Sequence, residues 1–263
     1  MSRPKRLTVL AKSAKVTTHW FPREDAPLNP LTHHRSIPVV WRDITYPVRV
    51  VDNFDGFLDA FAKEVDGNLT DERCPFGVLL WPSSRTLADT LASETPLPDV
   101  KLIVEMGCGV GFLACVLAKL YPDAQVIACD YEENLSSYVL ANAQTFGVED
   151  RVSFQKIDWR AAVPESLKGA SDLVVGADVF YDDSHLTHLP PFAAKLLMPE
   201  GKLLLADPKR FRFSKALDDL KALFTLDRHD EVSCALDKEG IEEFMVGTGY
   251  KEQKISILRL TSR

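Results

Sequence analysis

The segment Leu102-Ile-Val-Glu-Met-Gly-Cys-Gly-Val-Gly111 decides the fold class, because an apolar run leads directly into a glycine-rich turn. The run predicts a buried strand, and residues 112–120 after the turn predict a helix. Glycines let the backbone approach a ligand closely, and the N–H groups that open the next helix are available to an anionic group. The segment therefore predicts a strand, a turn and a helix that together hold a nucleotide-like cofactor.

The glycine spacing and one acid distinguish between two kinds of cofactor. After Gly107 and Gly109, the dinucleotide fingerprint G-x-G-x-x-G asks for glycine at position 112, where the chain has Phe112. Glu105 stands two residues before the first glycine. Its carboxylate would repel a pyrophosphate but attract the cationic amino and sulfonium groups of S-adenosylmethionine. The pattern favours S-adenosylmethionine and leaves an NAD-dependent oxidoreductase as a rival that would need this loop to accept a pyrophosphate.

From about residue 100 onward, apolar strand-like runs alternate with helical stretches, which predicts a parallel sheet with crossover helices. Strands are expected at 101–104, 125–129, 152–157, 172–176, 202–206 and 255–260, and helices at 112–120, 134–146, 186–197 and 214–223.

Acidic residues follow the second and third expected strands, at the edge of the sheet where the glycine turn lies. Asp130 ends the second strand and can accept both hydroxyls of a ribose. Asp158 ends the third strand and offers an acceptor to an adenine amino group. The ring of Trp159 offers a flat surface for stacking. Together these residues predict contacts to the nucleoside part of the cofactor.

The loop from Glu105 to Gly111, then Asp130 and then Asp158-Trp159 resemble, in this order, the successive cofactor motifs of the seven-strand S-adenosylmethionine-dependent methyltransferases. The resemblance covers roughly residues 75–263. It implies an α/β fold with a Rossmann-like, doubly wound, mostly parallel seven-stranded sheet in the order 3-2-1-4-5-7-6, the last strand antiparallel. The cofactor contacts that it implies within the loop and beyond are Gly107, Cys108, Gly109, Gly111 and Ala177.

Trp81 and the pattern Asp178-x-x-Tyr181 narrow the resemblance to the protein-lysine methyltransferase-like branch. A similar tryptophan lines the cofactor pocket in that branch, which implies that Trp81 is a cofactor contact. Trp81 precedes a helix that Ser83 or Ser84 could cap. The Asp178 element lies at the end of the fourth strand, at the topological switch point. In the branch that it resembles, the aspartate and tyrosine lie at the acceptor amine, so Asp178 and Tyr181 are the expected catalytic residues.

The leading expectation is therefore methylation of a lysine side chain on a protein. One alternative is N-methylation of a small-molecule amine, and another is a non-catalytic S-adenosylmethionine-binding protein that acts as an interaction module. The adenine-N6 branch has Asn or Asp followed by Pro-Pro and an aromatic residue, whereas Val179-Phe180 stand between Asp178 and Tyr181 here. A nucleobase acceptor is thus disfavoured.

Composition agrees with this class of enzyme. The chain has 263 residues, 46% of them hydrophobic, which is enough for a sizeable core, and 31 basic against 38 acidic residues give a net charge of -7. The acidic balance argues against a nucleic-acid partner and permits a basic one. Five cysteines without a CxxC pair favour a reducing compartment and no structural zinc. His185 and His188 are interpreted as exposed polar residues, so no metal is expected.

No apolar run reaches the length of a signal-peptide core or of a membrane span, so a cytoplasmic location without membrane contact is expected. Residues 1–70 differ from the rest in that prolines punctuate short apolar pieces. They predict an irregular or partly stranded N-terminal extension before a methyltransferase domain at 71–263. A short helix is expected with Phe54, Phe57, Leu58 and Phe61 on one face, which either packs on the main domain or covers a ligand.

Overall fold

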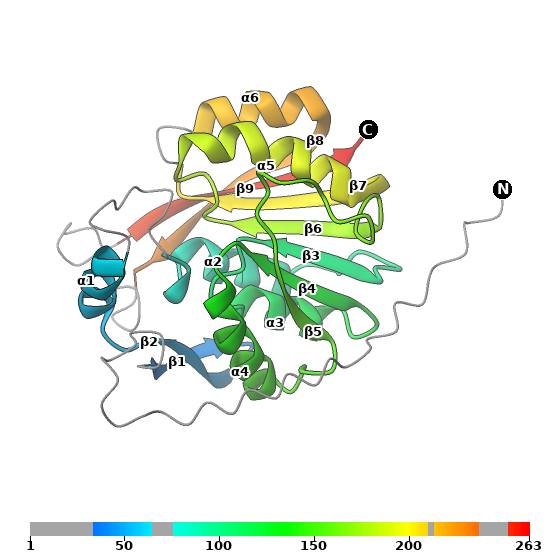
Figure 1. The fold of residues 1–263 in the computed structure, drawn as a ribbon. Coiled ribbons are helices and arrows are strands. Elements are labelled where there is room, and N and C mark those ends of the chain that lie inside the picture. Colours follow the sequence, from blue (N-terminus) through cyan, green and yellow to red (C-terminus); the bar gives the residue numbers. More distant parts are fainter. Residues whose placement is uncertain (1–33, 65–75, 210–212, 237–251) are drawn as a thin grey trace.

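A seven-stranded sheet forms the centre of the structure (Figure 1). The computed structural model describes residues 34–64, 76–209, 213–236 and 252–263, with the side chains of 60–64 left out. The strands of this sheet are β3 (Leu102–Met106), β4 (Gln125–Asp130), β5 (Val152–Lys156), β6 (Ser171–Ala177), β7 (Leu197–Asp207), β8 (Phe224–Ala235) and β9 (Glu252–Ser262).

The strand order is β5-β4-β3-β6-β7-β9-β8. Strands β3 to β7 pair in parallel, and β9 is antiparallel to both β7 and β8. Counted from β3 as the first strand, this is the order 3-2-1-4-5-7-6 with an antiparallel last strand, so the predicted fold class is confirmed. The central strands are buried on both faces, which explains why they appear in the sequence as continuous apolar runs.

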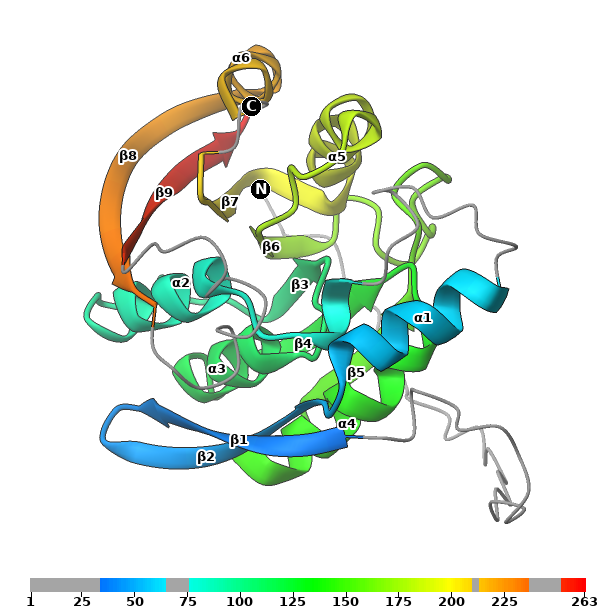
Figure 2. The same ribbon diagram turned by 90° about the vertical axis from the view of Figure 1, so that its left-hand side faces the viewer.

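Helices cover both faces of the sheet (Figure 2). One face carries α2 (Pro82–Ala92), α3 (Phe112–Leu120) and α4 (Ser136–Phe146), and the other carries α5 (Asp183–Leu196) and α6 (Phe213–Leu223). All residues of α3 except Lys119 are buried. Two apolar cores result, one on each side of the sheet. The doubly wound arrangement places the carboxyl ends of β3, β4 and β6 at one edge, where a ligand site is expected.

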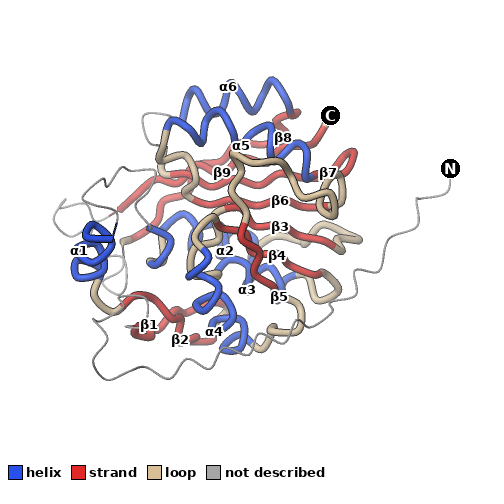
Figure 3. Tube along the Cα trace, in the orientation of Figure 1, coloured by secondary structure: helices blue, strands red, loops and turns tan. Residues whose placement is uncertain are grey.

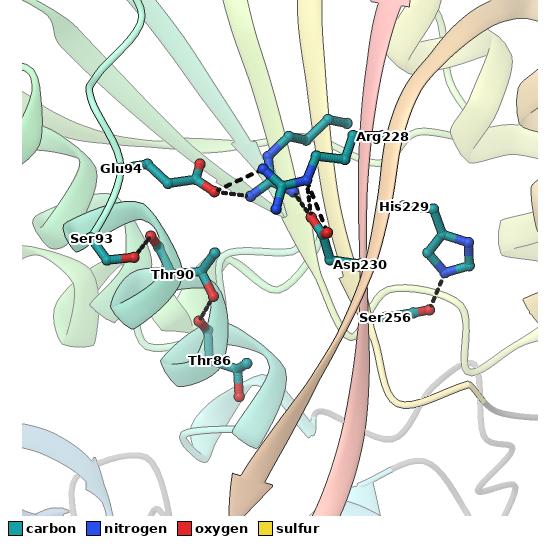
Figure 4. A network of polar contacts seen from close by, with 9 residues as sticks. Thr86, Thr90, Ser93, Glu94, Arg228, His229, Asp230 and Ser256 are labelled. Carbon is teal, nitrogen blue, oxygen red and sulfur yellow. Dashed lines mark hydrogen bonds and ion pairs between the residues drawn. The ribbon is translucent and has the colours of Figure 1, made fainter.

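The edge strand β8 was not among the strands expected from the sequence. Its side chains alternate between exposed and half-buried, and it carries four charged residues between Asp227 and Glu231. Ion pairs attach it to its surroundings: Arg228 of β8 lies 3.9 Å from Glu94 (Figure 4). Arg259 on β9 lies 2.5 Å from both Glu94 and Asp230. These pairs join the β8–β9 ribbon to the segment that follows α2.

A separate hairpin of β1 (His34–Trp41) and β2 (Ile44–Val51) packs outside α4 (Figure 3). Its two turn residues, Arg42 and Asp43, both have positive φ, as a tight two-residue hairpin turn requires. Tyr46 stacks on Phe146 of α4 with ring centroids 3.9 Å apart. The hairpin thus shares the core that lies under α2, α3 and α4.

Helix α1 (Phe54–Glu64) follows the hairpin. Phe57 is buried, and Phe54 and Leu58 pack against the same core, whereas the side chain of Phe61 lies outside the described residues. The part of the extension before residue 34 and the boundary near residue 70 also lie outside them. The division into two parts at this boundary stays a prediction. Within the described residues, no helix has both the length and the apolar character needed to cross a membrane.

Candidate active site

A cavity of about 350 Å³ opens at the carboxyl ends of β3, β4 and β6. Its walls come from the glycine turn, from the ends of these strands and from the segment that leads into α2. Of the residues predicted from the sequence, the cavity is lined by Trp81, Glu105, Gly107, Cys108, Gly109, Asp130, Trp159, Ala177, Asp178 and Tyr181. Residues that are far apart along the chain therefore line a single cavity.

The glycine turn is built so tightly that side chains would not fit. Gly109 has a φ of +51°, and a Cβ atom there would lie 2.8 Å from the backbone oxygen of Gly77. Gly111 has a φ of +77° and is the N-cap of α3, where a Cβ atom would lie 2.9 Å from Val139. Gly111 does not line the cavity, because it faces α4 instead. Its predicted cofactor contact stays a prediction, and what the structure shows is close helix packing.

Asp130 is nearly buried beside the glycine turn. Its Oδ2 accepts a hydrogen bond from the N–H of Gly109 (3.1 Å), and its Oδ1 accepts one from the N–H of Glu132 (3.2 Å). Burial raises the pKa of Asp130 to about 6, against the opposing effect of these backbone N–H groups. Each carboxylate oxygen has capacity for a further hydrogen bond, as two hydroxyl donors would require.

Glu105 is 2% exposed and lines the same cavity. Burial raises its pKa well above the usual range, the backbone N–H of Ala114 opposes this, and the nearby charge of Asp130 adds to it. Its Oε2 has no hydrogen-bond partner among the described residues. Since a buried carboxylate oxygen without a partner is costly, and no described Lys or Arg lines the cavity, the site suits a ligand that carries positive charge. The amino and sulfonium groups of S-adenosylmethionine fit this requirement.

Asp158 and Trp159 occupy different environments. The ring of Trp159 lines the cavity, but Asp158 does not. The carboxylate of Asp158 is paired with Arg160, with Nη2 2.6 Å from Oδ2, and this hydrogen bonding lowers its pKa. A contact from Asp158 to an adenine amino group stays a prediction.

Asp178 lies at the end of β6 with a left-handed backbone (φ +60°), which is uncommon for a residue other than glycine. Its N–H donates to the carbonyl of Ala206 (2.8 Å), and its Oδ2 accepts from the hydroxyl of Ser83 (3.3 Å). The side chain is 7% exposed and lines the cavity. Strained backbone of this kind is concentrated at functional sites, where the surrounding structure holds it.

Aromatic rings surround the part of the cavity near Asp178. Phe76 meets Tyr181 (5.9 Å, 82°) and Trp81 (6.0 Å, 83°) edge to face. The indole N–H of Trp81 donates to the carbonyl of Phe76 (2.9 Å). Burial, and to a smaller extent the nearby Tyr131 and acidic side chains, raise the pKa of Tyr181 above its ordinary value. The part of the cavity that these rings and the carboxylate of Asp178 line is called the mouth.

A model of the protein family described as lysine methyltransferase matches residues 69–220, more than half of the chain. The chain belongs to this family. The methyltransferase is 29% identical over 146 residues to the protein-lysine N-methyltransferase EFM3 of Chaetomium thermophilum, a match that covers 52% of this chain and 44% of that protein. It is 28% identical over 185 residues to the demethylspheroidene O-methyltransferase of Rhodobacter capsulatus, covering 66% and 43%. The matched part thus spans less than half of each of these relatives.

The fold of the methyltransferase is similar to that of the geranyl diphosphate C-methyltransferase from Streptomyces coelicolor, crystallised with Mg²⁺, geranyl diphosphate and S-adenosyl-L-homocysteine. The TM-score is 0.51 at 12% identity, and the match covers 68% of this chain and 77% of that one. This likeness concerns the fold alone. The family and the fit of the cavity agree that the methyltransferase depends on S-adenosylmethionine.

Two expectations about polar side chains near the site are wrong. Neither Ser83 nor Ser84 caps α2, which starts at Pro82 without a side-chain cap. Ser83 binds Asp178 instead, and the hydroxyl of Ser84 donates to the carbonyl of Trp81 (2.8 Å). His185 and His188 were both expected to be exposed, but His188 is half-buried and His185 is only 4% exposed. It forms no metal cluster, since the described residues contain no group of three or more metal-ligating side chains.

Some residues of the site were not predicted from the sequence. Phe76, Tyr131 and Leu135 line the cavity, and so does Glu132. A signal did exist for His185, because it lies on α5 one position before Leu186 and four before Leu189, and both leucines are buried. This spacing places His185 on the inner face of the helix.

Proposed function

We propose that the methyltransferase transfers a methyl group from S-adenosylmethionine to the side-chain amine of a lysine in a protein. The observation that carries this proposal is the position of Asp178, a nearly buried carboxylate that lines the same cavity as the aromatic rings of Phe76 and Tyr181. A negatively charged group in an apolar mouth suits an acceptor that arrives as a cation on a narrow apolar stem. A lysine side chain has this form.

The cofactor would be held by residues of the glycine turn and of the strand ends that line the cavity. Glu105 would meet its cationic amino-acid end, and Gly107 to Gly109 would allow its close approach to the backbone. Asp130 would accept the ribose hydroxyls, and the rings of Trp159 and Trp81 would border it. When bound, S-adenosylmethionine supplies an electrophilic methyl group on a sulfonium sulfur, so the protein has to position the acceptor and exclude water.

At the mouth, Asp178 would orient the entering amine, and Tyr181 would narrow the channel. A lysine amine has an ordinary pKa of about 10.4, so it has to lose a proton before it can act as a nucleophile. Partial burial against Phe76 and Tyr181 would lower the pKa of the amine, because desolvation penalises its charged form. The carboxylate of Asp178 opposes this effect, which suits a role in capture and orientation.

The similarity to the protein-lysine N-methyltransferase EFM3 supports a protein acceptor, although it covers 52% of this chain. Because the chain is also similar to an O-methyltransferase, the experiment has to distinguish transfer to nitrogen from transfer to oxygen. A small-molecule amine is the main alternative acceptor.

The test follows radioactive methyl groups from S-adenosylmethionine into a cell lysate that is then split by protease, nuclease and a size filter. The proposal predicts protease-sensitive label that survives mild base and appears as methylated lysine after acid hydrolysis. Label in the small-molecule fraction or in the nuclease-sensitive fraction would show that the acceptor is a small molecule or a nucleic acid and not a protein. Label released by mild base would indicate an ester and contradict transfer to an amine. Cofactor binding without any transfer would favour a non-catalytic binding protein.

A further inference from the structure

His185 lies behind the acceptor mouth, outside the set of residues that line the cavity. It belongs to the first turn of α5, just after the loop that carries Asp178 and Tyr181. Asp182 caps this helix by accepting a hydrogen bond from the N–H of Ser184 (2.8 Å). The helix therefore starts at a fixed point, and its first turn brings His185 back against the loop.

One ring nitrogen of His185 binds this loop directly. Nδ1 lies 2.9 Å from the carbonyl oxygen of Val179, so Nδ1 is the protonated nitrogen that donates. Val179 is itself 2% exposed, and it follows Asp178, whose left-handed backbone ends the regular ladder of β6. Without the imidazole, this buried carbonyl would lose that donor.

The imidazole ring also fixes two aromatic rings of the site. It meets Tyr181 at 4.6 Å between centroids with an angle of 84°, and Trp159 at 5.0 Å with an angle of 89°. Perpendicular ring pairs of this kind are favourable. Tyr181 therefore has perpendicular ring contacts with both His185 and Phe76.

An apolar side chain would fill this place without burying a polar ring. A histidine at this position makes two interactions: it donates a hydrogen bond to the Val179 carbonyl, and its ring contacts the ring of Tyr181. We propose that His185 is a positioning residue, which sets the orientation of Tyr181 at the acceptor mouth through the Val179 carbonyl and the ring contact. The functional part of this inference rests on the proposed role of Tyr181.

Two substitutions separate the two contacts. His185→Asn keeps an N–H donor near the place of Nδ1 but removes the ring, and His185→Phe keeps a ring but removes the donor. Each is expected to lower the rate of methyl transfer by about 10-fold to 100-fold, since small displacements at a reacting site have effects of this size. His188→Asn, on the same helix and half-buried, is the matched control and is expected to change the rate by less than about 2-fold.

A double-mutant cycle with Tyr181→Ala distinguishes positioning from general destabilisation. If His185 acts through Tyr181, its substitution has little further effect on transfer in the Tyr181→Ala protein. The same fold-loss in both backgrounds would overturn the inference. If Tyr181→Ala alone leaves transfer unchanged, the proposed role of Tyr181 is wrong, and the following measurement still tests the position of the ring.

That measurement uses protein labelled with 3-fluorotyrosine and fluorine NMR, with the Tyr181 signal assigned by its loss in Tyr181→Phe. The signal is expected to shift or broaden in His185→Asn and in His185→Phe, and to stay in place in His188→Asn. An unchanged Tyr181 signal in a folded His185 variant would contradict the inference. Because the two variants remove different contacts, either one that folds is sufficient for this test.

Discussion

Asn142 on α4 binds Arg49 on β2 at both backbone polar atoms: its Oδ1 accepts from the Arg49 N–H (2.7 Å), and its Nδ2 donates to the Arg49 carbonyl (3.2 Å). The same Nδ2 also donates to the carbonyl of Val110 in the glycine turn (2.8 Å). Asn142 is fully buried. One side chain therefore joins the N-terminal hairpin to the loop that borders the cofactor cavity.

Replacing Asn142 with alanine should destabilise the protein strongly, because three backbone groups lose their partner in a buried place. We expect the free energy of unfolding in urea to fall by about 3 kcal/mol. Thr145→Ala on the same helix changes an exposed residue and should stay within about 0.5 kcal/mol. A loss in Asn142→Ala as small as in this control would show that the hairpin contributes little to the fold.

Asp130→Ala should weaken the binding of S-adenosylmethionine by about 1 to 3 kcal/mol, because charged hydrogen bonds to the ribose are lost. Titration calorimetry with wild type and variant measures this directly. Glu133→Gln is a suitable control, because Glu133 is exposed and lies after the same strand. Equal affinity in Asp130→Ala and wild type would remove the ribose assignment.

The raised pKa of Asp130 predicts a pH dependence of cofactor affinity. With a pKa of about 6, Asp130 is mostly ionised at pH 7 and mostly protonated at pH 5. If the ionised form binds the ribose, affinity should fall by about 10-fold from pH 7 to pH 5. The contribution of Asp130 to the stability of the cofactor-free protein has the opposite sign. Because the folded pKa lies above the ordinary 3.8, this contribution is present below pH 4 and is lost as the pH rises through about 6.

Calorimetry between pH 5 and pH 8 tests this, with Asp130→Asn as the control that removes the titrating group. If the affinity of Asp130→Asn falls near pH 6 in the same way as that of wild type, another residue causes the pH dependence.

Alanine substitutions at two glycines with positive φ, Gly147 and Gly109, distinguish the effect of backbone strain from that of steric conflict. Gly147 ends α4 with a φ of +62° and has nothing within 4 Å of a built Cβ atom, so Gly147→Ala should cost about 1 kcal/mol from strain alone. Gly109→Ala adds a contact of 2.8 Å to the backbone of Gly77, which should cost a further 1 to 3 kcal/mol or so. Thermal unfolding and cofactor calorimetry on both variants check this. Reduced cofactor affinity is expected only for Gly109→Ala, and equal effects of the two variants would contradict the tight turn.

The central strands of the sheet left the clearest pattern in the sequence, because they are buried on both faces. Strands β3, β4 and β6 are continuous apolar runs, and the turn after β3 needs glycine for steric reasons, so both leave a clear pattern. The edge strand β8 has a single neighbour and many exposed charges, so its pattern resembles that of a loop. A seventh strand was expected only because the chain resembles a seven-strand family, and no periodic pattern in the sequence indicated β8.

The site shows the same division. Asp130 and Asp178 could be predicted because they follow strands whose ends must meet at one edge of the sheet. The roles of Ser83 and His185 could not, although spacing placed His185 on the inner face of its helix, because each role depends on which residue of another element the side chain faces. Ser83 satisfied the sequence rule for a helix cap, and in the fold it binds a carboxylate 95 positions away.

Asp178 is proposed to serve the acceptor and not the cofactor, and the substitution Asp178→Asn separates these two roles. Methyl transfer to protein and the dissociation constant of S-adenosylmethionine are measured side by side for wild type, Asp178→Asn and the exposed control Asp183→Asn. We expect the rate of methyl transfer by Asp178→Asn to fall by about 100-fold or more, while its affinity for the cofactor stays within a few-fold of wild type. Collapse of cofactor binding in Asp178→Asn, or transfer at the wild-type rate, would contradict this role of Asp178.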